Sequence, residues 1–117
     1  MSLSRFFLLS LLVLPGPALA KTMSCPASYR GQTLAQVDLF DGPPAEMADL
    51  VPDRDFATKD GKTSVWNVHY VYEQSRSVYL QCQYGSGRII INVHAKSPVH
   101  TCTYTEHKDG KKSLSCH

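Results

Sequence analysis

The sequence lacks the short motifs that mark most small enzymes and metal-binding proteins. It contains no GxSxG nucleophile elbow and no CxxC pair, and none of its five histidines forms an HxH or HxxxH arrangement. Residues 85–87 (Gly-Ser-Gly) are too few for a phosphate-binding loop and indicate a hairpin turn. We therefore expect no catalytic residues, no metal site and no cofactor. A glycoside-cleaving pair such as Asp41 with Asp53 is the enzymatic alternative.

Long basic stretches are also absent. The formal net charge is +2 at pH 7, and Lys and Arg are scattered along the chain, which argues against nucleic acid as a partner. Acidic residues are distributed unevenly, because only three of them follow residue 60. The others lie within residues 38–60: Asp38, Asp41, Glu46, Asp49, Asp53, Asp55 and Asp60. This segment is either ordinary solvated surface or an acidic loop that offers carboxylates to a basic partner.

The only long apolar run lies at the N-terminus. Residues 6–15 are apolar except for one serine, follow the positively charged Arg5, and precede an Ala-Leu-Ala cleavage site that ends at Ala20. The run is shorter than the roughly 20 residues that a membrane-spanning helix needs. We expect residues 1–20 to be a signal peptide that is cleaved after Ala20.

The mature chain, residues 21–117, is then an exported single domain without a membrane span. A retained N-terminal anchor is one alternative. Another is a lipoprotein acylated at Cys25, for which the preceding Thr-Met-Ser is a poor acylation box.

Four cysteines in an exported chain of this size predict two disulfides. Three pairings are possible, and strand register favours one of them. If the Asp-Gly at residues 109–110 forms the tip of a hairpin, positions equidistant from the tip face each other. This register pairs Cys102 with Cys116 and leaves Cys25 for Cys82.

Alternation of apolar and polar residues predicts most of the strands. Val78, Leu80, Cys82 and Tyr84 share one face of residues 77–84, and Ala35, Val37 and Leu39 would share a face further upstream. Similar patterns predict strands at residues 33–40, 65–72, 77–84, 88–94, 100–106 and 113–116, with a hairpin connection at 73–76. We expect a mainly β fold: a small antiparallel sheet or sandwich of five to six strands, stabilised by two disulfides.

A proline-rich insertion separates the first two predicted strands. Residues 44–50 suit either about two turns of helix, with proline at the first position, or an irregular loop. Proline-fixed loops lose little entropy on binding, so the insertion is a candidate contact for a protein partner. The candidate partner-binding carboxylates are Asp41, Glu46, Asp49 and Asp53. The alternative is a structural strap that covers an open sheet edge.

The single tryptophan lies in the predicted strand 65–72. An extended conformation places Trp66, Tyr70 and Tyr72 on one aromatic face. Such a face either packs in the core or forms a platform for a glycan or lipid.

Several motifs together resemble a known family. Leu39-Phe-Asp-Gly-Pro-Pro44, Leu50-Val-Pro-Asp53, the single tryptophan, Tyr79-Leu-Gln-Cys82 and a late cysteine pair resemble a family of small, largely uncharacterised periplasmic proteins of Gram-negative bacteria. The resemblance spans nearly the whole mature chain and implies a periplasmic location. Some members are similar to inhibitors of cell-wall hydrolases, and others to immunity proteins that accompany secreted toxins. The resemblance supplies no catalytic residues.

These observations support one hypothesis and one alternative. The hypothesis is a non-enzymatic periplasmic protein that binds another protein, as an inhibitor or immunity factor against a peptidoglycan-directed enzyme or toxin. Its acidic insertion would contact a basic cleft. The alternative is a structural or small-ligand (glycan or lipid) binding module of the cell envelope.

Overall fold

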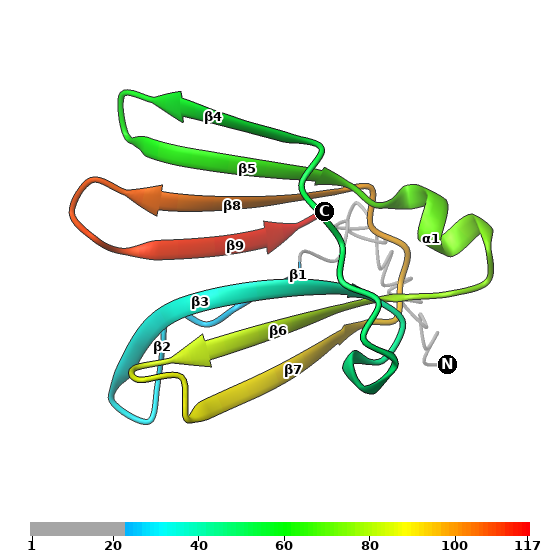
Figure 1. Ribbon diagram of the computed structural model, residues 1–117, viewed down its shortest axis with the longest axis horizontal. Coiled ribbons are helices and arrows are strands. Elements are labelled where there is room, and N and C mark those ends of the chain that lie inside the picture. The colour runs from blue at the N-terminus through cyan, green and yellow to red at the C-terminus, as the bar shows by residue number, and fades with distance from the viewer. Residues whose placement is uncertain (1–22) are drawn as a thin grey trace, which may run out of the picture.

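The computed structural model describes residues 23–117, so the predicted signal peptide and its cleavage site lie outside the described residues. The protein is mainly β, as the sequence predicted, and its two antiparallel sheets pack against each other (Figure 1). One sheet has the order β1-β9-β8-β5-β4, and the other has the order β2-β3-β6-β7. The strands are β1 (Met23–Ser24), β2 (Ser28–Tyr29), β3 (Gln32–Asp41), β4 (Arg54–Thr58), β5 (Gly61–Asn67), β6 (Val78–Tyr84), β7 (Ile89–Ala95), β8 (Thr101–His107) and β9 (Lys112–Cys116).

Strand β6 forms the centre of the four-stranded sheet and shows the predicted alternation. Val78, Leu80, Cys82 and Tyr84 are all fully buried, while the residues between them are partly exposed. Strand β3 departs from simple alternation. Leu34 and Leu39 are five positions apart, so simple alternation would place them on opposite faces of the strand. A register shift between Leu34 and Gln36 lets both reach the core. The predicted common face of Ala35, Val37 and Leu39 is therefore interrupted at Ala35.

Both disulfides are present, with the pairing that the hairpin register predicted. Cys102 and Cys116 are direct partners on β8 and β9. Cys25 bonds to Cys82 of β6, and its own N–H donates to the carbonyl of Leu114 in β9, 3.2 Å away. The first bond lies within one sheet, whereas the second fastens the two sheets together.

The predicted strand 65–72 is wrong beyond Asn67. The chain leaves the five-stranded sheet there and forms the short helix α1 (His69–Glu73) before it enters the other sheet as β6. Val68 and Val71 are both buried, and their spacing of three residues suits a helix. The predicted hairpin connection at 73–76 is also wrong, because β5 and β6 belong to different sheets.

Strand β4 has no counterpart in the sequence prediction. All five of its residues are exposed, so its sequence lacks the apolar positions that usually indicate a strand. The turn into β5 ends at Gly61, which has φ +147°. A Cβ atom there would lie 1.9 Å from the carbonyl oxygen of Glu106, so only glycine fits.

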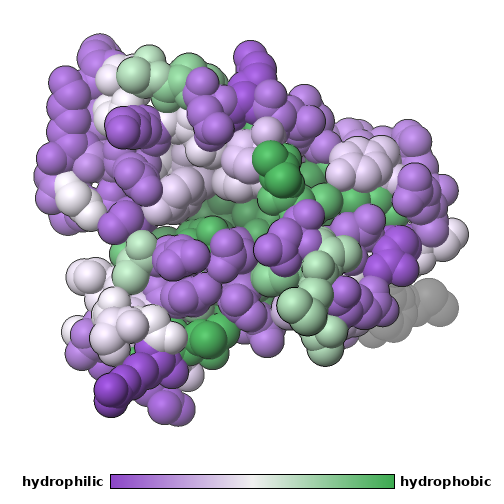
Figure 2. All heavy atoms as spheres, in the orientation of Figure 1, coloured by the Kyte–Doolittle hydropathy of each residue, from purple (hydrophilic) through white to green (hydrophobic). Residues whose placement is uncertain are grey.

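The core lies between the sheets and continues under α1. Figure 2 shows apolar surface between two polar layers. The largest fully buried side chains come from both sheets and from the segment that joins them: Leu39, Val68, Val71, Val78, Leu80, Tyr84, Val99 and Leu114. Among residues 23–117, no helix has the length and apolar character needed to cross a bilayer.

Candidate functional site

The proline-rich insertion crosses from one sheet to the other. We call residues 41–53 the strap, because they run from the end of β3 to the start of β4 (Figure 1). The predicted two turns of helix reduce to one short 3-10 turn, η1 (Pro44–Glu46). Met47 ends the turn in the left-handed region, at φ 58°, and its N–H donates to the carbonyl of Pro44.

Backbone hydrogen bonds fold the strap back along β3. The N–H of Asp41 donates to the carbonyl of Ala48 at 2.9 Å, and the N–H of Leu50 donates to the carbonyl of Leu39 at 2.8 Å. Phe40 and Asp49 form an isolated antiparallel bridge between these bonds. The strap therefore covers part of the open edge of β3, which is the structural role that the sequence left as an alternative.

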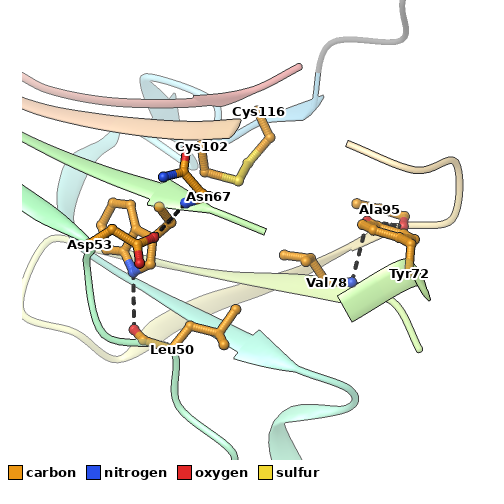
Figure 3. Close-up of a disulfide and its surroundings, with 9 residues drawn as sticks. Leu50, Asp53, Asn67, Tyr72, Val78, Ala95, Cys102 and Cys116 are labelled. Carbon is orange, nitrogen blue, oxygen red and sulfur yellow. Dashed lines mark hydrogen bonds between the residues drawn. A yellow bond between two sulfur atoms is a disulfide. The ribbon is translucent and has the colours of Figure 1, made fainter. Parts of the chain in front are cut away.

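Three of the four predicted partner-binding carboxylates have contacts within the protein. Arg76 donates to the Asp41 carboxylate at 2.7 Å, to the Asp41 carbonyl at 3.0 Å and to the Glu46 carboxylate. These hydrogen bonds, Asp41 first and then Glu46, raise the pKa of Arg76 above its ordinary value. The Asp53 carboxylate accepts from the backbone N–H of Asn67 at 2.6 Å (Figure 3).

Asp49 differs from the other three acids. It is exposed, and its side chain forms no ion pair or hydrogen bond within residues 23–117. The four predicted carboxylates therefore differ in role. Asp41, Glu46 and Asp53 fix the shape of the strap, whereas the Asp49 carboxylate forms no ion pair or hydrogen bond within residues 23–117 and is free to meet a partner.

The most exposed large apolar side chains of the described chain also lie on the strap. Met47 is 82% exposed and Val51 is 81% exposed. Met47 also adopts the left-handed backbone conformation, which costs a non-glycine residue about 1 kcal/mol. Such strain persists where the surrounding structure imposes the conformation. From the sequence, Met47 was expected to pin the loop if residues 44–50 were irregular, and its exposure shows that this is wrong. Neither residue was predicted as a binding contact. The strap presents Met47, Asp49 and Val51 on a backbone that is already ordered.

The predicted aromatic platform does not form. Trp66 is only 6% exposed, and its indole N–H donates to the carbonyl of Leu50 at 3.0 Å. Tyr72 donates to the carbonyl of Ala95 at 2.8 Å and accepts from the N–H of Val78 (Figure 3). The core reading of Trp66 is correct. The platform is wrong because α1 replaces the strand that would have aligned the three rings.

Tyr70 is the one exposed member of that set, at 46%. Burial, followed by the negative charges of Asp41 and then Asp53, raises the pKa of its phenol. Its hydroxyl therefore lies within the electrostatic reach of Asp41 and Asp53 of the strap.

The arrangement suits binding rather than catalysis. Three of the four strap carboxylates, those of Asp41, Glu46 and Asp53, make backbone or arginine contacts that a structural role explains. Within residues 23–117, no group of three or more His, Cys, Asp or Glu side chains is placed to hold a metal ion.

Comparison with protein families gives one match over most of the chain. The model of the family described as type VI secretion system Tli immunity protein matches residues 26–117. No curated protein and no solved structure shows a significant match. The matched range includes the strap, every strand except β1 and all but one residue of the two disulfides.

Proposed function

The chain belongs to the type VI secretion system Tli immunity protein family, and on that premise we propose that it binds and neutralises a type VI lipase toxin. It is an immunity protein and not an enzyme. From the sequence we predicted a peptidoglycan-directed enzyme or toxin as the target. This prediction is wrong, because the family connects the protein to a lipase effector. The alternative of an envelope module with an aromatic platform loses its structural basis, since Trp66 is buried.

We place this activity in the periplasm. Two disulfides suit an oxidising compartment, where an exported chain would form them. Under this proposal the mature protein is a single domain of residues 21–117, released by cleavage after Ala20, and it meets the toxin outside the cytoplasmic membrane.

The observation that carries the proposal is the exposure of Met47 and Val51 on an ordered strap. Both side chains are more than four-fifths exposed and lie four residues apart on one loop, so they offer apolar contact surface to a partner. Methionine is enriched at protein interfaces. A pre-ordered loop also loses less conformational entropy on binding than a flexible one. The strap would insert both side chains into apolar depressions on the toxin, with the Asp49 carboxylate between them opposite a basic group.

The test uses oxidised residues 21–117 and a catalytically inactive type VI lipase effector from the same genome. We expect a Met47→Ser/Val51→Ser double variant to lose affinity on the order of 100-fold, which corresponds to a loss of about 1.4 kcal/mol for each apolar contact. Titration calorimetry measures the affinity, and inhibition of the active lipase measures the protection.

The matched control is Ile90→Ser on β7. Ile90 is 50% exposed and lies on the other sheet edge, away from the strap, so its loss should leave the affinity unchanged. Equal affinities of the double variant and the Ile90→Ser variant would show that the strap is not the contact surface.

A further inference from the structure

A groove lies between the strap, the edge of β3 and the inner face of the five-stranded sheet. One cavity of about 350 Å³ is lined by Leu39, strap residues 49–52, Trp66 and Tyr104, among others. A second cavity of about 460 Å³ is lined by residues 55–57, Glu106 and again Tyr104. The two cavities share Ser64 and Tyr104 in their linings and therefore adjoin, and together we call them the inter-sheet groove. Figure 2 shows the surface hollowed between the two layers.

The edge of β3 beside this groove is unpaired in its middle. Strand β2 pairs with β3 at Gln32 and Thr33, and the strap pairs with it at Leu39 and Asp41. Leu39 directs its carbonyl toward the strap, and backbone groups of a strand alternate in direction. Val37 therefore directs its N–H and carbonyl toward the same edge, where no residue of the described chain pairs with it. An exposed length of strand edge is a template for an added strand.

The lining of the groove has an apolar floor and mostly acidic walls. Leu50 and Trp66 contribute apolar surface, while Asp49, Asp55 and Glu106 contribute carboxylates. Asp55 accepts from the hydroxyl of Ser64 at 2.5 Å, and Glu106 accepts from the hydroxyl of Tyr104 at 3.3 Å. These bonds orient the two carboxylates without neutralising them. Among the residues that line these two cavities, Lys62 is the only basic one.

We propose that the inter-sheet groove binds an extended, basic segment of the toxin, which adds as a short strand beside β3. This inference rests on the proposed immunity function and specifies the chemistry of the partner. The backbone of Val37 would hydrogen-bond to the added segment, and the carboxylates would select Lys or Arg on it. The groove continues directly from the strap, since Asp49, Leu50 and Val51 line it, so one toxin surface can contact both.

Amide hydrogen exchange of the complex with the inactive lipase effector tests the backbone part of the proposal. The N–H of Val37 should exchange about tenfold or more slowly in the complex, because the added strand would protect it. If the complex forms and Val37 exchanges at its free rate, the groove is not occupied and this inference fails while the immunity function stands. If no complex forms, the proposed function itself fails.

Charge variants test the electrostatic part. Asp55→Asn/Glu106→Gln keeps the size of both side chains and should weaken binding about tenfold, whereas Lys62→Gln should strengthen it. The matched control is Glu73→Gln/Asp109→Asn, which removes the same charge from α1 and the β8–β9 hairpin tip. If the groove pair and the control pair change the affinity equally, only the net charge matters and the proposed specificity is wrong.

Discussion

The two sheets use their inner faces differently. In the four-stranded sheet the whole inner face of β6 is dry, and its four inward side chains have no exposed surface. In the five-stranded sheet the inner face is buried only near Trp66, Cys102 and Leu114. Toward the hairpin tips the same face carries Lys62 and Glu106 and borders the groove. One sheet thus supplies stability along its full length, and the other divides its inner face between the core and a binding surface.

The largest expected effect distinguishes the bond between the sheets from the bond within one sheet. Cys25→Ala/Cys82→Ala removes the disulfide between residues that are 57 apart in sequence. Cys102→Ala/Cys116→Ala removes the disulfide between residues that are 14 apart. The chain-entropy relation predicts losses of about 4 and about 3 kcal/mol, respectively. Urea unfolding of both variants measures the difference, and a larger loss for the Cys102–Cys116 pair would contradict the assigned roles.

The next largest effect compares the inner faces directly. Leu80→Ala leaves a cavity where the side chain is fully buried, and we expect a loss of about 3 kcal/mol in the free energy of unfolding. Ser64→Ala lies on the groove side of the other sheet and should cost less than about 1 kcal/mol, because it removes one exposed hydrogen bond. Similar losses in thermal unfolding of the two variants would mean that the groove side is also part of the core.

The smallest effect is a pH dependence that arises at the groove. Burial, followed by the charge of Glu106, raises the pKa of Tyr104 to about 12 from an unfolded value of 10.0. The unfolded chain therefore loses this proton first, and the contribution to stability is complete below pH 10 and disappears as the pH rises toward 12. Tyr104→Phe should reduce the decline measured by chemical unfolding between these values. The decline should not vanish, since burial also raises the pKa of Tyr72 and Tyr84.

Local patterns were sufficient to predict much of the fold. The strict alternation of β6 and the position of the Asp-Gly turn predicted the strand, the hairpin register and the Cys102–Cys116 bond, because each depends on residues that are close in sequence. The Cys25–Cys82 bond joins residues 57 apart and followed only by elimination. The segment 65–72 was ambiguous, since Val68 and Val71 satisfy a helical period while its β-branched and aromatic residues favour a strand. Strand β4 could not be predicted because an exposed edge strand needs no apolar pattern.

The candidate site was only partly predictable, for a different reason. The sequence shows where the carboxylates of the strap are, but not that Arg76 pairs with Asp41 and Glu46 from the turn after α1. The inter-sheet groove combines β3, the strap, β5 and β8, which meet only after the two sheets pack. Both features depend on contacts between residues far apart in the chain, and no local pattern records them.

The pairing of Arg76 with Asp41 and Glu46 has a consequence for binding experiments at different ionic strengths. The side chains of these ion pairs are partly exposed, so added salt weakens the pairs by screening. Screening loosens the attachment of the strap and increases the entropy that is lost when a partner orders it. Affinity should therefore fall with salt concentration even for a toxin surface without charge. Salt sensitivity of the complex will report the order of the strap as well as charges across the interface.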